Sequence, residues 1–274
     1  MKSEKRIVAI YLSLCDRFPS FRKTTHRWLY ETMARNVRQE AWTFMNYGYA
    51  CADQEPIPAL EPVDEPYRLS YQLYHQLVRN VPLAHKSVLE VGSGRGGGAS
   101  MLHKYMVPAR MTGLDYSREA VQLCRNHYPA SGLEFIQGDA EHLPLPDESY
   151  DVILNVESSH CYGSVPAFLN EATRVLKPGG TFLLTDLRPR KDLPELREHL
   201  SSSRLTVLEE REITDRVVQA LEMDHDNRLQ TIRNHIPKAF LGPFTEFAGV
   251  EGSTVLNNLR SGNSVYVSFH CRKP

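Results

Sequence analysis

A glycine-rich run follows a short apolar segment and could bring a ligand close to the backbone. The run Gly92 to Gly98 (GSGRGGG) directly follows Ser87 to Val91 (SVLEV) and contains the spacing G-x-G-x-x-G. Small residues at the start of a helix let backbone N–H groups approach a nucleotide-like ligand. The spacing alone fits NAD, FAD or S-adenosylmethionine (SAM) equally, and it is also compatible with a glycine-rich turn that binds nothing.

Three acidic residues help to separate these alternatives, because each stands at the end of a predicted strand. Glu90 precedes Gly92 by two residues, and a carboxylate there suits a ligand with an ammonium group better than a pyrophosphate. Asp115 ends the next apolar run, where it could accept from both hydroxyls of a ribose. Asp139 follows the third run and is available to the amino group of an adenine. One acid could simply cap a helix, but three at successive strand ends favour a binding crevice.

His160 is the candidate for proton transfer. It follows the apolar run 150–156 by a short loop, at the same edge of the predicted sheet as the three acids. An ordinary histidine pKa near 6.5 suits removal of a proton from a hydroxyl at neutral pH. Glu157 is the predicted orienting partner. The alternative is that His160 only hydrogen-bonds a loop carbonyl.

Alternating apolar and amphipathic segments must position these residues. From residue 87 onward the pattern is that of βαβ units, which predicts a parallel sheet with helices on both faces. Residues 1–80 are predicted to form an N-terminal helical arm or lid. Residues 81–274 are predicted to form the ligand-binding domain, with a cap insertion at about 212–250. After Asp186 the pattern predicts a helix, a strand, a charged helical insertion and a closing strand (193–201, 205–209, 214–235 and 265–270).

The composition is that of a globular protein. Of 274 residues, 41% are hydrophobic and 24% charged, which is close to globular averages. The formal net charge is -1, so no overall positive field attracts a polyanion, and nucleic acid is not an expected partner. The 5 cysteines are widely spaced without a C-x-x-C pair, and the histidines lack metal-ligand spacing. We therefore expect a cytoplasmic protein without a metal site.

The N-terminal segment does not match a targeting segment or a membrane span. The apolar positions between residues 7 and 18 follow helical spacing and are too few for a membrane span. They also lack the small residues of a cleavage site. We expect a packing helix that could join two copies into a homo-oligomer.

Taken in order, these motifs resemble class I SAM-dependent methyltransferases. The resemblance rests on VLEVGSGRGGG, LDYS, GDAEHLPLPDESYDVI and RVLKPGGTFLLTD, with the LKPGG turn as the most specific part. A closer resemblance is to the phthiotriol/phenolphthiotriol dimycocerosate methyltransferases and related natural-product methyltransferases. It rests on FMNYGY (44–49), DEP (64–66), LYH (73–75), NVESSHCY (155–162) and DLRP (186–189). The sequence departs from that family in its N-terminal helix and in 214–247, which leaves the acceptor open.

The resemblance implies a Rossmann-like seven-stranded α/β sheet with helices on both faces, an N-terminal helical arm and a helical lid before the last strand. It implies SAM as cofactor and S-adenosylhomocysteine (SAH) as product. Tyr47 should close over the sulfonium, because an electron-rich ring tolerates a cation; buried packing is the alternative. The implied cofactor-binding residues are Tyr47, Glu90, Gly92, Ser93, Gly94, Gly96, Asp115, Tyr116, Asp139, Ala140, Glu141 and Asn155. The expected acceptor-pocket residues are Tyr49, His75, Phe240 and Phe244.

The expected activity is methylation of a small, largely apolar secondary metabolite of lipid, polyketide or terpenoid type. O-methylation of a hydroxyl with His160 as base is the leading interpretation. C-methylation of an alkene or aromatic ring, coupled or not to cyclisation of a carbocation, is the first alternative. A SAM-binding module without turnover and a dinucleotide oxidoreductase are the others.

Overall fold

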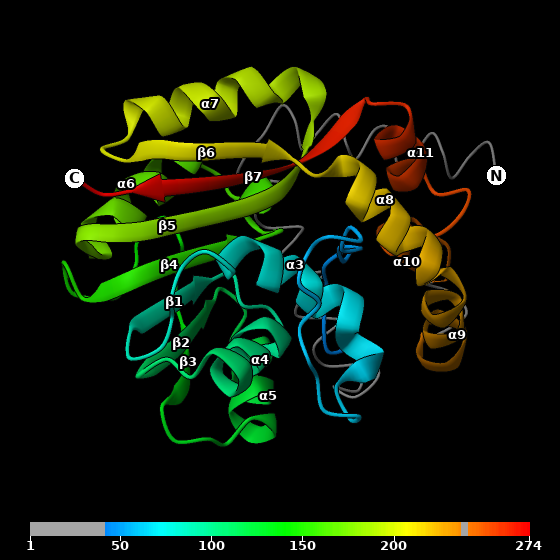
Figure 1. The fold of residues 1–274 in the computed structure, drawn as a ribbon, viewed down its shortest axis with the longest axis horizontal. Coiled ribbons are helices and arrows are strands. Elements are labelled where there is room, and N and C mark those ends of the chain that lie inside the picture. The colour runs from blue at the N-terminus through cyan, green and yellow to red at the C-terminus, as the bar shows by residue number, and fades with distance from the viewer. Residues whose placement is uncertain (1–41, 237–240) are drawn as a thin grey trace.

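The structure, a computed structural model, describes residues 42–236 and 241–274 (Figure 1). The predicted helix at 7–18, with its proposed role in oligomer formation, lies outside the described residues, as does Phe240. The division of the chain at residue 80 stays a prediction. No helix in the described ranges is long and apolar enough to cross a membrane.

A seven-stranded sheet forms the centre of the described structure, as expected for the class I methyltransferase fold. Its spatial order is β3-β2-β1-β4-β5-β7-β6. The strands are β1 (Ser87–Val91), β2 (Arg110–Asp115), β3 (Leu133–Gln137), β4 (Tyr150–Val156), β5 (Leu176–Pro189), β6 (Thr206–Glu212) and β7 (Ser264–Arg272).

The parallel arrangement predicted for the alternating segments from residue 87 is confirmed, whereas no orientation was predicted for the closing strand β7. The pairs among β1 to β5 are parallel, but β7 runs antiparallel to both of its neighbours, β5 and β6. A strand buried between two others shows the same apolar run in either direction, so the pattern could not give its orientation. The segment LKPGG is not the separate turn that the sequence predicted. It forms the bulged start of β5, where the pairing with β4 shifts between Tyr150 and Val152.

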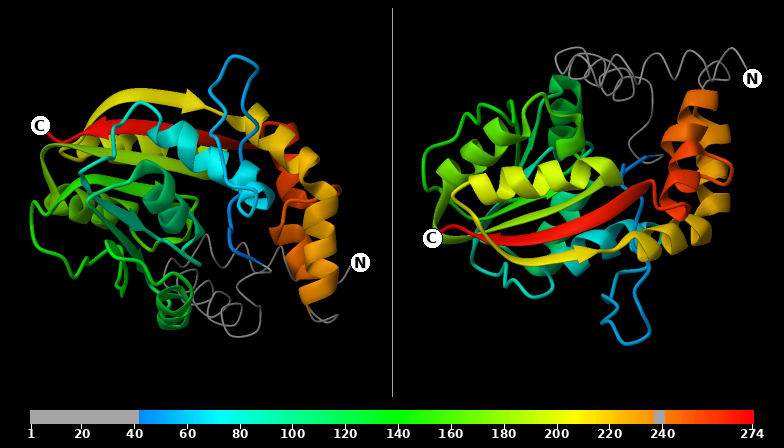
Figure 2. Two further views of the ribbon diagram at one scale, coloured as in Figure 1. Left: turned by 60° about the horizontal axis from the view of Figure 1, so that its bottom comes forward. Right: turned by 90° about the horizontal axis from the view of Figure 1, so that it is seen from above.

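Helices cover both faces of the sheet (Figure 2). They are α3 (Arg68–Val78), α4 (Gly97–Met106), α5 (Arg118–His127), α6 (Val165–Val175), α7 (Leu193–Ser202), α8 (Thr214–Met223), α9 (His225–His235), α10 (Leu241–Phe247) and α11 (Thr254–Arg260). The core on one face includes side chains from α3, α4, α8 and α11, and the core on the other face includes side chains from α6 and α7.

Alternation along each strand divides the apolar residues between these two cores. In β1, Val88 faces the first core while Leu89 and Val91 face the second, and all three are fully buried. The helices α8 to α11 lie beyond the end of the sheet where β6 ends and β7 begins (Figure 1). Since β6 is antiparallel to β7 and β7 to β5, this is also the edge at which the parallel strands have their carboxyl ends.

Candidate active site

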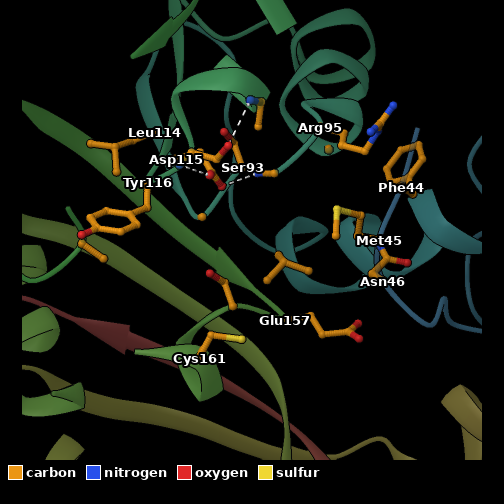
Figure 3. Close-up of a pocket in the computed structure, with 18 of the residues that line it drawn as sticks. Phe44, Met45, Asn46, Ser93, Arg95, Leu114, Asp115, Tyr116, Glu157 and Cys161 are labelled. Carbon is orange, nitrogen blue, oxygen red and sulfur yellow. Dashed lines mark hydrogen bonds between the residues drawn. The ribbon is translucent and has the colours of Figure 1, made fainter. Parts of the chain in front are cut away.

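A cavity lies at the carboxyl ends of β1, β2 and β4, where a parallel sheet of this kind binds ligands (Figure 3). Its wall combines the glycine-rich loop after β1, the loops after β2, β3 and β4, and the segment 43–47 that precedes α3. The residues of the wall that the sequence had predicted are Tyr47, Gly92, Ser93, Gly94, Asp115, Tyr116, Asp139, Ala140, Glu141, Glu157 and His160. The structure therefore brings most of the predicted site together.

The glycine-rich loop needs its glycines for two different reasons. A Cβ on Gly98 would stand 2.1 Å from the Tyr74 ring, and one on Gly92 would stand 2.0 Å from Ser158 Oγ, so packing excludes side chains at both positions. Gly94 has a positive φ of 53°, yet the nearest atom to an added Cβ is Met45 Sδ at 3.6 Å. The space at Gly94 thus opens into the cavity and is available to a ligand.

Asp115 is held in place by the glycine-rich loop. Its Oδ2 accepts from Gly94 N–H at 2.8 Å and its Oδ1 accepts from Ser117 N–H at 2.8 Å (Figure 3). Burial raises the pKa of Asp115 in spite of these bonds. Each carboxylate oxygen can accept more than one hydrogen bond, so Asp115 can still accept from a ligand hydroxyl.

The loop after β3 is held from within. Asp139 Oδ1 accepts from Glu141 N–H at 3.0 Å, and Glu141 Oε1 accepts from Gly163 N–H at 2.9 Å. Glu141 thereby joins this loop to the one after β4. Ala140, which lies between the two acids, is buried and lines the cavity.

Three predicted cofactor residues lie behind the wall of the cavity instead of on it: Glu90, Gly96 and Asn155. Glu90 is fully buried, and Glu90 Oε1 accepts from Tyr74 Oη at 2.7 Å. Burial raises the pKa of Glu90 to about 7. Asn155 Nδ2 donates to Val91 O and to Tyr162 Oη, both at 2.9 Å, and so joins β4 to β1.

The predicted acceptor residues Tyr49, His75 and Phe244 do not line the cavity. Tyr49 is buried with its hydroxyl on Glu55 Oε2 at 2.8 Å, because the positive φ of Gly48 turns the chain after Tyr47. His75 lies beside the Tyr71 ring in α3, and Phe244 packs edge-on against Trp42. The apolar wall is made by other residues, namely Phe44, Met45, Leu187 and Phe247.

The orienting partner of His160 is Asp186, and the prediction of Glu157 in that role is wrong. His160 Nδ1 lies 2.7 Å from Asp186 Oδ1, and His160 N–H donates to Asp186 Oδ2 at 3.0 Å. The 3-10 turn Ser159–Cys161 folds the chain after β4 back over the neighbouring strand β5, which carries Asp186. Glu157 is three residues from His160 in sequence, but its carboxylate bonds elsewhere.

Asp186 is fully buried and is held by two further groups. Arg188 Nη1 lies 2.9 Å from Asp186 Oδ2, and Ser159 Oγ donates to the same oxygen at 2.6 Å. Burial acts to raise the pKa of Asp186, but Arg188 and His160 outweigh it and keep the pKa well below its usual range. Burial likewise opposes protonation of His160, but Cys161 and Asp186 together raise the pKa of His160 well above its usual value.

Glu157 joins three distant parts of the chain. Its Oε2 accepts from the backbone N–H of Tyr47 at 3.0 Å and from Tyr266 Oη at 2.8 Å. Its backbone has a φ of 48°, which a residue with a side chain rarely adopts. Burial raises the pKa of Glu157 to about 7, although the bond from Tyr266 acts in the opposite direction.

Comparisons with known proteins decide the family. The chain is 39% identical over 246 residues to the fatty-acid O-methyltransferase of Mycolicibacterium smegmatis, covering 90% of this chain and 89% of that protein. It is 38% identical over 244 residues to the phthiotriol/phenolphthiotriol dimycocerosates methyltransferase of Mycobacterium tuberculosis, covering 89% and 90%. Residues 89–184 match the family described as "Methyltransferase domain". The chain belongs to this family of SAM-dependent methyltransferases.

Solved structures agree on the fold of this methyltransferase. The [4+2]-cyclase SpnF superimposes with a TM-score of 0.67 at 19% identity, covering 90% of this chain and 94% of that one. Geranyl diphosphate C-methyltransferase from Streptomyces coelicolor A3(2) gives 0.62 at 15% identity, covering 89% and 98%. At such identities the likeness concerns the fold alone, so these neighbours do not decide the acceptor.

The polar groups around the cavity fit SAM. Ser93 Oγ lines the cavity and is buried without a hydrogen-bond partner among the described residues. Asp115 keeps accepting capacity at the end of β2, and the backbone at Gly94 leaves room beside it. Carboxylates that face the cavity or lie directly behind it suit a ligand with positive charges.

Proposed function

We propose that this methyltransferase methylates an oxygen atom of a lipid-like acceptor, with His160 as the general base. The observation that carries the proposal is the hydrogen bond between His160 Nδ1 and the buried Asp186 carboxylate, in a histidine that lines the cavity. A carboxylate can only accept a hydrogen bond, so Nδ1 must carry the proton. Neutral His160 then has its lone pair on Nε2, the nitrogen available to a substrate.

The proposed proton transfer needs His160 in its neutral form. Nε2 takes the proton of the acceptor hydroxyl, which makes the acceptor oxygen a nucleophile for an electrophilic methyl group. SAM supplies this electrophilic methyl group when bound. Asp186 stabilises the imidazolium that results, and Arg188 keeps Asp186 ionised. Because the pKa of His160 is raised, we expect the activity to increase toward alkaline pH.

The residues proposed to hold the cofactor follow the chain around the cavity. Asp115 would accept from the ribose hydroxyls, and Asp139 with Ala140 would contact the adenine. The glycine-rich loop with Ser93 would lie against the methionine part. Glu90 lies behind this wall and would act on the ammonium group through its charge. Tyr47 would close the cavity at the opposite side, where its hydroxyl bonds to Phe247 O at 3.0 Å.

A lipid-like acceptor is supported by the wall and by the relatives. Phe44, Met45, Leu187 and Phe247 give the wall of the cavity an apolar part. One relative is named for fatty acids and another for phthiotriol dimycocerosates. We therefore propose an acceptor that carries one oxygen nucleophile on a long apolar chain.

The test compares His160→Gln with the wild type on a long-chain alcohol and on the matching fatty acid. Loss of a general base should lower kcat for the alcohol by about 10²- to 10⁴-fold, while SAM affinity measured by calorimetry changes little. The fatty acid is ionised without help and should lose less activity. His75→Gln, which changes a histidine that does not line the cavity, is the matched control. Full activity of His160→Gln on the alcohol would contradict the proposal and would favour C-methylation of an electron-rich acceptor.

A further inference from the structure

Two carboxylates near His160, the fully buried Asp186 and the half-buried Glu157, have very different surroundings. Asp186 is paired with the guanidinium of Arg188 and with His160. Glu157 accepts only from neutral donors, the Tyr47 N–H and the Tyr266 hydroxyl, and no Lys or Arg of residues 42–236 and 241–274 forms an ion pair with it. His160 is close enough to act on Glu157 through its charge, but its Nδ1 is engaged by Asp186.

A carboxylate that is partly withdrawn from water is costly when no cation pairs with it, and among the described residues none pairs with Glu157. Removal of a charge from water is unfavourable unless an opposite charge or hydrogen bonds compensate it. The backbone of Glu157 also has an unfavourable positive φ of 48°. Glu157 nevertheless lines the cavity, and its carboxylate lies between the β4 loop and the segment that carries Asn46 (Figure 3). The balancing positive charge can therefore come from a ligand.

The position of His160 indicates which part of the ligand supplies the positive charge near Glu157. The acceptor oxygen must lie at His160 to lose its proton, and the methyl carbon must lie beside that oxygen to be transferred. Glu157 precedes His160 by three residues and lines the same cavity. Asp115 is the last residue of β2, and Asp139 lies in the loop after β3. The sulfur end of the cofactor must therefore point toward Glu157 and His160, with the adenosine on the side of β2 and β3.

We infer that Glu157 is the counter-charge to the sulfonium of SAM and makes the enzyme prefer SAM over SAH. The inference rests on the proposed function, because His160 marks where the methyl group must lie. SAM and SAH share the adenosine, the ammonium and the carboxylate. They differ at the sulfur, which is a positively charged sulfonium in SAM and a neutral thioether in SAH. A carboxylate beside the sulfur attracts the positive sulfonium of SAM but not the neutral sulfur of SAH. It therefore also favours release of SAH after each turnover.

The test measures the affinities of SAM and SAH for the protein without acceptor at pH 8, where Glu157 is ionised, by calorimetry. In Glu157→Gln the side-chain carbonyl can still accept from Tyr47 N–H and Tyr266 Oη, so the variant removes the charge and keeps the shape. We expect the Kd of SAM to increase at least about tenfold and the Kd of SAH to change less than about twofold. Sinefungin, which has an amine at the place of the sulfonium methyl, should follow SAM.

Glu90→Gln is the matched control. Glu90 is a fully buried carboxylate behind the glycine-rich loop, where the proposal places the methionine ammonium that both ligands share. Its removal should weaken SAM and SAH by the same factor. An equal loss for both ligands in Glu157→Gln, or no loss for either, would overturn the inference.

These measurements need no turnover, so they separate the inference from the proposed function. If Glu157→Gln loses the preference for SAM while His160→Gln still methylates the alcohol, the assignment of Glu157 as counter-charge is supported and the assignment of His160 as base is refuted. If His160→Gln is inactive but Glu157→Gln keeps the preference for SAM, the assignment of His160 as base is supported and the assignment of Glu157 as counter-charge is refuted.

Discussion

The two ends of the cavity are built in different ways. At the end formed by β1, β2 and β3, the polar groups are held by contacts close in sequence: Asp115 bonds to residues 21 and 2 positions away, and Asp139 to one 2 positions away. At the end near His160, Glu157 bonds to Tyr47 across 110 residues, and Tyr47 bonds to Phe247 across 200. Arg228 Nη2 donates to Asn46 O across 182 residues.

The difference between local and long-range contacts indicates how sensitive each end of the cavity is to changes in sequence. Local loops at strand ends keep their shape as long as the sheet is intact, so the proposed nucleotide end depends on a few residues. The proposed acceptor end is assembled from the segment before α3, the loop after β4 and the helices α9 and α10. A change in any of these parts would alter the wall at that end.

The largest effect is expected at Gly92, where the two ends meet. An alanine Cβ there would lie 2.0 Å from Ser158 Oγ, and the φ of 79° would be strained as well. Gly92→Ala should lower the free energy of unfolding by about 3 kcal/mol or more. Gly252→Ala has a similar φ of 83° with no atom within 4 Å of the new Cβ, so it isolates the strain and should cost about 1 kcal/mol. Equal losses in chemical denaturation would show that the contact with Ser158 is unimportant.

A smaller effect, mainly on cofactor binding, is expected at Asp115. Asp115→Ala removes the proposed acceptor of the ribose hydroxyls and should weaken SAM by about 1.5 to 3 kcal/mol, or roughly 10- to 150-fold. SAH should weaken by the same factor, because both ligands have the ribose. Calorimetry measures the two affinities, and circular dichroism checks the fold. The loss of the Gly94 and Ser117 bonds should also lower the melting temperature. Unchanged affinity in a folded variant would refute the ribose assignment.

The smallest effect tests the acceptor end alone. Tyr47→Phe removes the single hydrogen bond to Phe247 O and should raise the KM of a lipid acceptor about fivefold, which corresponds to about 1 kcal/mol. SAM affinity should stay within about twofold. Tyr71→Phe is the control, since the Tyr71 hydroxyl is buried without a hydrogen-bond partner among the described residues and does not line the cavity. A larger change in SAM affinity than in KM would mean that the two ends are not independent.

Much of the sheet and of its nucleotide end could be predicted from the sequence. Glu90, Asp115 and Asp139 were placed at successive strand ends because alternating apolar runs give the positions of parallel strands. The orientation of β7 could not be predicted, since a buried strand has the same pattern in both directions. Pro178, Gly179 and Gly180 are typical of turns, so the sequence did not show that LKPGG forms the bulged start of β5.

The partner of His160 shows where sequence reasoning failed. Glu157 was chosen because it is near in sequence, whereas Asp186 becomes near only through the pairing of β4 with β5, in which Val156 lies beside Thr185. Asp186 could have been found from the order of the strands, because the loop after β4 must pass the end of the strand next to it. The acceptor wall offered no such rule: Tyr49, His75 and Phe244 are aromatic or polar residues that the fold uses for packing.

The pH dependence of kcat/KM for a lipid alcohol tests the central claim most directly. Because Cys161 and the support of Asp186 together raise the pKa of His160, the wild type should gain activity as pH rises through that pKa and then reach a plateau. In Asp186→Asn this support is lost, so the rising limb should move to lower pH by about one unit or more and the plateau should fall. Glu157 and Cys161, which also interact with His160 through charge, are present in both proteins, so they do not cause a difference between the two pH profiles. An unmoved limb in an otherwise active Asp186→Asn variant would contradict His160 as the base oriented by Asp186.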